Sequence, residues 1–194
     1  MRSGLGELMQ VFALIDYDNV KPYQQERAAT DVEANLLRIA EHVTAVARDN
    51  YPGTTHLELR LYGGWTDRMD GSTASSVWMD RVIHKVRKRF NRIRVVPEIA
   101  VSNYDCSLPR LVGLYRDGGQ KMVDTLIVAD LITLTHEFEC PVLLLSEDDD
   151  MIPGLVAARS AKRNLTLVRN RSLGEGMNDH VVGSLNLQIS GGMT

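Results

Sequence analysis

The chain has 194 residues, of which 44% are hydrophobic and 24% are charged, and its formal net charge is −3 at pH 7. These values are ordinary for one globular domain with a full hydrophobic core. They exclude a protein that attracts nucleic acid through overall positive charge, so any polyanion must be held by a local basic surface. We find no signal-peptide pattern and no apolar run long enough to span a bilayer, so we expect a cytoplasmic protein without a membrane partner.

The first part of the chain alternates between strand and helix patterns. Residues 11–16 (VFALID) form an apolar run that ends in an acid, which predicts a buried strand. Residues 30–48 space apolar side chains at helical intervals, and Thr30 or Asp31 is expected to cap this helix. Residues 57–64 alternate and then break at two glycines, which predicts a second strand.

The rest of the chain continues this alternation. Residues 75–90 predict a helix, and residues 93–101 predict a strand whose proline favours a sheet edge or a bulge. Residues 102–119 are expected to form a loop that leads into a helix over residues 121–138. The last expected elements are a strand over 141–146, a helix over 151–163 and strands over 165–170 and 184–189.

The predicted strands are continuous apolar runs, which is typical of strands buried on both faces. Together with the strand–helix alternation, this predicts a mostly parallel central sheet with helices on both sides. We therefore expect one α/β domain over residues 1–194, a three-layer α/β/α sandwich with a frayed tail over residues 190–194. The two cysteines, Cys106 and Cys140, lack the spacing of a zinc or redox motif and are expected to be free, half-buried thiols.

Acidic residues follow two predicted strands and begin one predicted helix. Asp16 ends the first strand, and Asp148 and Asp150 follow the strand over residues 141–146. Asp124 lies in the first turn of the helix after the long loop. Because ligands bind at the carboxyl ends of parallel strands, we expect these side chains to meet at one edge of the sheet.

Carboxylates that share a site repel one another and are tolerated when a divalent cation lies among them. A set of oxygen ligands alone favours Mg²⁺ or Mn²⁺. Such an ion lowers the pKa of a bound water and neutralises charge on a phosphate. The sequence therefore predicts metal-assisted hydrolysis of phosphodiester bonds.

Local structure offers a simpler explanation for three of these acids. Asp124, Asp148 and Asp150 lie at predicted helix starts, where acids stabilise the helix dipole. Asp16 is harder to explain in this way, because an acid that ends a buried strand needs partners.

Neighbouring polar residues are expected to have lesser roles. Asp18 and Glu147 are expected to face solvent or to support a loop. Asn19 either caps the turn after the first strand or holds a carboxylate by a hydrogen bond.

Three motifs in order resemble a known family. They are LIDYDN, in which an asparagine follows the strand-ending acid, then KMVDTLIVAD, then LLLSEDDDMIP, in which acids follow an apolar strand. Taken together, these motifs resemble the NYN group of PIN-like nucleases over residues 11–170. The matching residues are Asp16 and Asn19 in the first motif, Lys121, Val123, Asp124 and Asp130 in the second, and Ser146, Asp148, Asp150 and Pro153 in the third.

This resemblance implies a PIN-like, Rossmann-like fold and a Mg²⁺- or Mn²⁺-dependent endoribonuclease in which a metal-activated water cuts RNA. The implied catalytic and metal-binding acids are Asp16, Asp124, Asp148 and Asp150. The implied supporting residues are Asn19, Lys121, Ser146 and Asp130, of which Asp130 is expected on a different helix face from Asp124. The chain departs from the family at Glu147 and Met151, where glycine and a large aromatic residue are frequent, and over residues 64–120.

A basic segment is the candidate surface for nucleic acid. Residues 81–94 (RVIHKVRKRFNRIR) contain seven Lys or Arg residues and no acid. On a helix, basic side chains gather opposite an apolar side and suit a phosphate backbone. The alternative is a solvated helix face. The candidate contacts are Arg81, Lys85, Lys88 and Arg89, together with Trp65, which either stacks on a base or anchors its loop.

Two rival functions remain open. The segment IDYDNV also resembles the start of haloacid-dehalogenase-like phosphatases, in which Asp16 would be a covalent nucleophile and Asp18 a general acid. The other rival is a non-catalytic module that binds RNA or a protein on the same fold. Because small nucleases of this type often pair, a homodimer is also left open.

Overall fold

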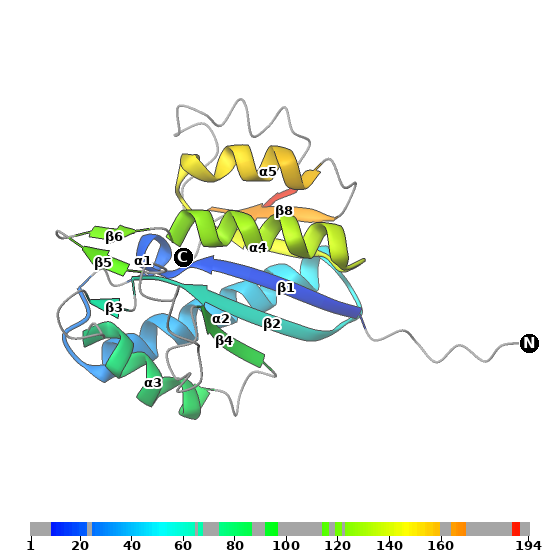
Figure 1. The fold of residues 1–194 in the computed structure, drawn as a ribbon. Coiled ribbons are helices and arrows are strands. Elements are labelled where there is room, and N and C mark those ends of the chain that lie inside the picture. Colours follow the sequence, from blue (N-terminus) through cyan, green and yellow to red (C-terminus); the bar gives the residue numbers. More distant parts are fainter. Residues whose placement is uncertain are drawn as a thin grey trace, which may run out of the picture.

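The computed structural model has a central sheet with helices on both sides (Figure 1). Its six strands run parallel in the order β4-β2-β1-β7-β8-β9. A smaller sheet has the order β3-β5-β6. The structure describes residues 9–22, 25–64, 66–67, 74–86, 92–96, 114–116, 119–121, 123–159, 164–169 and 188–190.

In chain order, the elements are β1 (Met9–Asp16), α1 (Tyr17–Val20), α2 (Ala29–Asn50), β2 (Thr54–Tyr62), β3 (Thr66–Asp67), α3 (Ala74–Val86), β4 (Arg92–Val96), β5 (Leu114–Arg116), β6 (Gly119–Lys121), α4 (Val123–Glu137), β7 (Val142–Leu145), the 3₁₀ turn η2 (Asp149–Met151), α5 (Ile152–Arg159), β8 (Leu165–Val168) and β9 (Gln188–Ser190).

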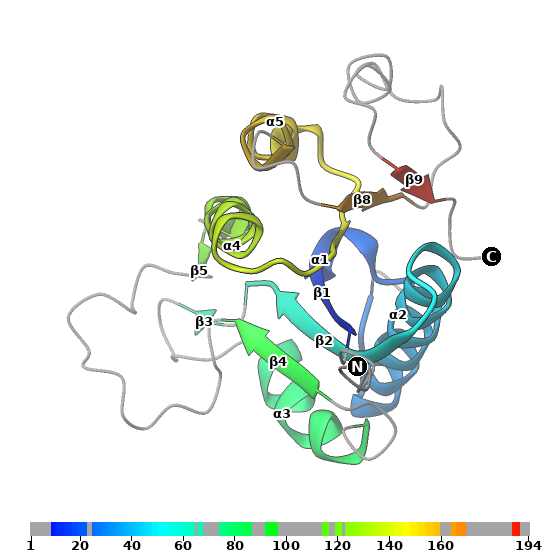
Figure 2. The ribbon, with the colours of Figure 1, turned by 90° about the vertical axis from the view of Figure 1, so that its right-hand side faces the viewer.

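Two hydrophobic cores lie on opposite faces of the central sheet. Helices α2 and α3 pack on one face, where they meet Ala13 and Ile15 of β1. Helices α4 and α5 pack on the other face, where they meet Phe12 and Leu14. The two helix pairs lie on either side of the sheet (Figure 2). Successive residues of β1 thus enter opposite cores, which explains the continuous apolar run and confirms the predicted three-layer α/β/α fold.

Helix α2 begins earlier than the sequence predicted. Its N-cap is Ala28 rather than Thr30 or Asp31. Asp31 instead lies within the first turn, where its Oδ2 accepts hydrogen bonds from the backbone N–H groups of Arg27 (2.8 Å) and Ala28 (3.1 Å). The acid satisfies amide groups at the helix start from inside the helix, so the expected position of the cap was wrong.

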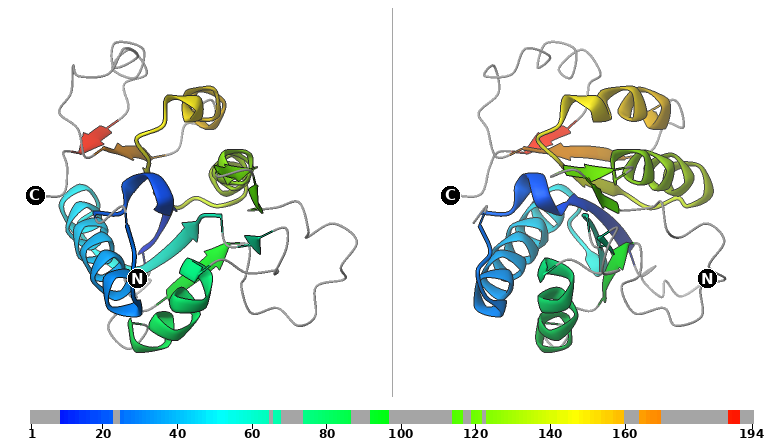
Figure 3. Two further views of the ribbon diagram at one scale, coloured as in Figure 1. Left: turned by 90° about the vertical axis from the view of Figure 1, so that its left-hand side faces the viewer. Right: turned by 60° about the vertical axis from the view of Figure 1, so that its left-hand side comes forward.

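The region before α4 also differs from the prediction. Residues 114–116 and 119–121 form an antiparallel pair of strands instead of a loop and the first residues of a helix. Lys121 therefore ends β6, and α4 begins at Val123. Strands β5 and β6 lie beside the start of α4 (Figures 1 and 3). Two strands of three residues each carry too few side chains for a visible alternation.

Two further expectations agree with the structure. Strand β4 lies at one edge of the central sheet, as the proline of its segment predicted, although Pro97 itself lies outside the described residues. Cys140 is a free, half-buried thiol, and Cys106 lies outside the described residues. Among the helices of the described residues, none has the length and apolar character that crossing a membrane requires.

A glycine sets the distance between α4 and α5. A Cβ atom added at Gly154 would lie 2.7 Å from Cγ2 and 2.9 Å from Cγ1 of Val128. Valine has a stiff side chain, so it cannot turn away freely. We therefore expect Gly154→Ala to lower the free energy of unfolding by about 1–3 kcal/mol through overpacking, measured by urea denaturation. The double variant Val128→Ala/Gly154→Ala should recover part of that loss, and a purely additive double variant would contradict the close packing.

Candidate functional site

The carboxylate of Asp16 lies at the carboxyl end of β1, in the middle of the sheet. The residue has no exposed surface. Its Oδ2 accepts one hydrogen bond from Nδ2 of Asn19 (2.7 Å) and another from Oγ of Ser146 (2.8 Å). Within the described part of the chain, its Oδ1 is buried and has no hydrogen-bond partner. One oxygen of this acid is thus firmly held, and the other is in need of a ligand.

Ser146 connects Asp16 to the acidic turn after β7. While its hydroxyl donates to Asp16, its Oγ accepts from the backbone N–H of Asp148 (3.1 Å). Asp148 then caps η2, because its Oδ1 accepts from the N–H of Asp150 (2.9 Å). The capping explanation for Asp148 is therefore correct as a description of local structure. The same turn nevertheless places this acid next to the carboxyl end of β1.

Asp124 joins the cluster from the other side, in the first turn of α4. Its Oδ1 is buried and likewise has no hydrogen-bond partner among the described residues. Burial raises the pKa of Asp124, and repulsion by Asp148 and Asp150 raises it further. Asp124 is thus coupled electrostatically to both acids of the turn after β7, and to Asp16 as well.

The pKa of Asp16 is raised as well. Burial raises it from 3.8 to about 6, against the hydrogen bonds from Asn19 and Ser146, which lower it. Repulsion by Asp124 and Asp148 adds to the increase. The folded chain thus favours the protonated form of Asp16, or a cation that compensates its charge.

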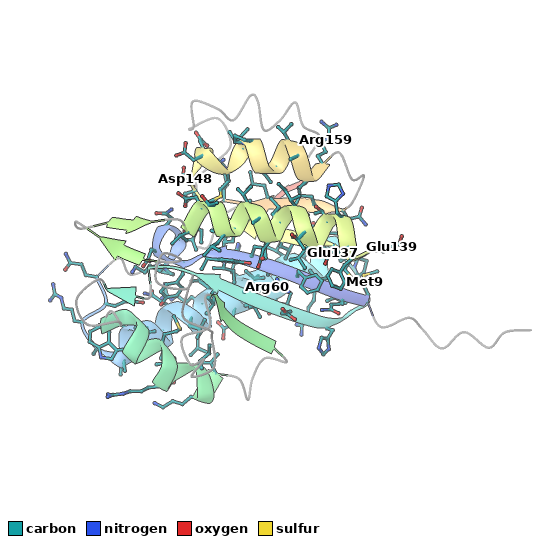
Figure 4. The ribbon with its side chains drawn as sticks, viewed as in Figure 1. Met9, Arg60, Glu137, Glu139, Asp148 and Arg159 are labelled. Atoms are coloured by element: carbon teal, nitrogen blue, oxygen red, sulfur yellow. The ribbon has the colours of Figure 1, made fainter. Side chains whose placement is uncertain are left out.

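The acids are close neighbours, yet they do not form a closed set of ligands. Among the described residues, no group of three or more His, Cys, Asp or Glu side chains is arranged to hold a metal ion. One reason is that Oδ1 of Asp148 is turned toward the backbone of Asp150. The unpaired buried oxygens of Asp16 and Asp124 fit a hard divalent cation, since both are carboxylate oxygens that repel each other without one. Asp148 lies at this end of the helices, whereas Glu137 and Glu139 lie at the far end of α4 (Figure 4).

Asp130, one of the candidate supporting residues, has other partners. Its Oδ2 accepts from Nη1 of Arg60 (3.0 Å) and from the hydroxyl of Tyr62 (2.5 Å). This network joins α4 to β2, and burial is the main cause that raises the pKa of Tyr62. Asp130 thus fastens the helix that carries Asp124, on a different side of that helix. The side chain of Lys121 lies outside the described residues.

Asp18 supports the loop, as the sequence predicted. Its Oδ1 accepts from Nζ of Lys21 (2.9 Å), and its Oδ2 accepts from the backbone N–H of Gly64 (3.0 Å). Both oxygens are therefore engaged, one of them by a cation.

The structure describes only part of the basic segment. Arg81 and Lys85 are exposed on α3, and Lys85 forms an ion pair with Glu33 of α2 (3.3 Å). Helix α3 packs beside α2, on the opposite face of the sheet from α4. The remaining candidate contacts, Lys88, Arg89 and Trp65, lie outside the described residues.

The sequence patterns did not single out Arg169, a buried residue near the acids. Arg169 follows β8 directly and is only 2% exposed, and its Nη2 donates to Oδ1 of Asp149 (2.9 Å). The available signal was the same as for Asp16, a charged residue directly after an apolar strand (LTLVRN).

Compared with known proteins, the chain matches no protein-family model, and no curated protein is significantly similar to it in sequence. The resemblance to NYN nucleases thus rests on the three sequence motifs alone.

The raised pKa of Asp16 makes a prediction about stability. A folded-state pKa of about 6 against 3.8 means that this carboxyl group contributes stability at low pH and loses it as pH rises toward 6 and above. The difference corresponds to roughly 3 kcal/mol at neutral pH. We therefore expect Asp16→Asn to raise the unfolding free energy of the metal-free protein at pH 7.5 by up to that amount, and by less at pH 5. Urea denaturation in EDTA measures this.

Asp18→Asn is the matched control for this measurement. It removes the same charge from the same loop but breaks the ion pair with Lys21, so it should not stabilise the protein. An Asp16→Asn variant that is less stable than the wild type at pH 7.5 would contradict the crowding of these carboxylates.

Proposed function

We propose that the protein is a metal-dependent nuclease that hydrolyses phosphodiester bonds, and that it is an endoribonuclease of the NYN type. The observation that supports this most is the meeting of four acids at the carboxyl edge of the sheet, with buried, unpaired oxygens on Asp16 and Asp124. The order of the three sequence motifs adds the family and the preference for RNA.

In this proposal, Asp16, Asp124, Asp148 and Asp150 hold one or two Mg²⁺ or Mn²⁺ ions. A bound ion of this kind supplies a water of lowered pKa and neutralises charge on the phosphate under attack. Asn19 and Ser146 hold Oδ2 of Asp16 by hydrogen bonds, which would leave its unpaired Oδ1 to bind the ion. The backbone N–H of Asp148 donates to Ser146, whose hydroxyl donates to Asp16, so hydrogen bonds link the acidic turn to the end of β1.

The substrate is assigned to nucleic acid on charge and chemistry. Because the net charge is −3, a phosphate backbone would need a local basic surface. Arg81 and Lys85 on α3 are the exposed candidates for it, and Lys85 also pairs with Glu33. Lys88, Arg89, Lys121 and Trp65 remain candidate contacts. A cytoplasmic location and a homodimer remain predictions.

The phosphatase alternative is less well supported. It requires Asp18 to donate a proton to a leaving group, whereas both oxygens of Asp18 accept hydrogen bonds, one of them from Lys21. A carboxylate paired with a cation is a poor general acid near neutral pH. A module that only binds RNA or a protein would have no use for the repulsion between the buried acids.

Cleavage of labelled RNA in the presence of Mn²⁺ tests the proposal. We expect Asp148→Asn to reduce cleavage by on the order of 100-fold or more, because a neutral amide oxygen is a much weaker ligand for a hard divalent cation. Equal cleavage by the wild type and Asp148→Asn would eliminate the proposed site. A wild type that cuts neither RNA nor DNA would favour the binding module.

Asp18→Asn separates the nuclease from the phosphatase. Asparagine keeps an oxygen that can accept from the N–H of Gly64, so RNA cleavage should stay within about threefold of the wild type, since the residue lies outside the proposed metal site. Loss of all turnover, together with phosphatase activity of the wild type on a phosphate monoester, would support the phosphatase instead.

A further inference from the structure

The acidic turn after β7 has an unusual composition for its position. Glu147, Asp148, Asp149 and Asp150 are consecutive, and Asp150 is the one exposed residue among them. Like charges at this spacing repel one another, so the turn needs fixed anchors to keep its shape. Two of these anchors are hydrogen bonds donated by backbone N–H groups, from Asp148 to Ser146 and from Asp150 to Asp148. Met151 adds a third, because it is fully buried in the core under α4 and α5.

Asp149 has an anchor of a different kind. Its Oδ1 accepts from Nη2 of Arg169 at 2.9 Å, and the side chains of Arg169 and Asp149 are 2% and 26% exposed. A guanidinium group buried to this extent is costly unless it is paired. Removing one partner of such a pair therefore has a larger effect than removing an exposed acid.

The strand register explains why Arg169 reaches this turn. Leu145 of β7 pairs with Ile15 of β1 and with Val168 of β8. Asp16, Ser146 and Arg169 each come one residue later, and all three are almost completely buried. They form a row across three neighbouring strands at the carboxyl edge of the sheet. Ser146 connects this row to Asp148 and Arg169 connects it to Asp149, so the turn is held at two adjacent residues.

We infer that Arg169 is a positioning residue that acts through Asp149. It holds the acidic turn so that Asp148 and Asp150 stay near Asp124. Breaking the ion pair between Arg169 and Asp149 therefore weakens metal binding. Asp149 is not one of the four proposed ligands, and its Oδ1 accepts a hydrogen bond from the arginine. The inference rests on the proposed metal site and extends it to two residues outside the three motifs.

Mn²⁺ titration of the full chain by calorimetry tests this inference, with Asp149→Asn compared with Glu147→Gln. Both variants remove one negative charge from the same acidic run, but only Asp149→Asn removes the charge that forms the ion pair with Arg169. We expect Asp149→Asn to weaken Mn²⁺ binding by roughly 10–100-fold, as loss of a partner that orients a ligand does. Glu147→Gln should change it by less than about threefold. At saturating Mn²⁺, RNA cleavage by Asp149→Asn should recover, because the ligands themselves are intact.

The outcomes of these experiments distinguish the role of Arg169 from the proposed metal site itself. Equal weakening in both variants would show that charge rather than position matters, and it would overturn the role of Arg169 while leaving the metal site in place. Cleavage by Asp149→Asn that stays low at saturating Mn²⁺ would also overturn it. A wild type that binds no Mn²⁺ would overturn the proposed function, and this inference with it.

Discussion

The structure depends on how one buried carboxylate is held at the end of the central strand. Asp16 has no exposed surface, and its raised pKa shows that the fold bears a cost for the ionised form. Asn19 and Ser146 hold one of its oxygens from the two sides of the strand end. Such an arrangement presents a negative charge in a fixed direction. A divalent cation is the simplest partner that would offset the cost of burying this charge.

The parallel sheet supplies the frame for this charge. Because β1, β7 and β8 run in the same direction and in register, their carboxyl ends bring polar residues into one row. Asp124 lies in the first turn of α4. Hydrogen bonds from Arg60 and Tyr62 to Asp130 attach this helix to β2. The acids are thus placed by the topology of the fold, which brings Asp16 close to three acids that follow it by more than 100 residues in the chain.

Much of this could be predicted from the sequence, for a physical reason. An acid at the end of an apolar strand is a strong signal, because burial leaves it few local explanations, and Asp16 does lie buried at the carboxyl end of β1. Asp148 follows β7 as expected, but its capping of η2 also gives it a local explanation. The small sheet was missed because β5 and β6 are too short to show a pattern. Arg169 was missed because its partner, Asp149, lies in another segment, and a sequence does not reveal which of four consecutive acids an arginine will choose. The cap of α2 was misplaced because Asp31 acts from inside the helix.

A crystal structure of the protein grown with Mn²⁺, with anomalous diffraction to locate the ion, tests the central claim most directly. We expect an ion bound to Oδ1 of both Asp16 and Asp124, with Asp148 or Asp150 completing the contact from the acidic turn. An anomalous peak elsewhere on the surface, with Oδ1 of Asp16 still without a ligand at saturating Mn²⁺, would contradict it.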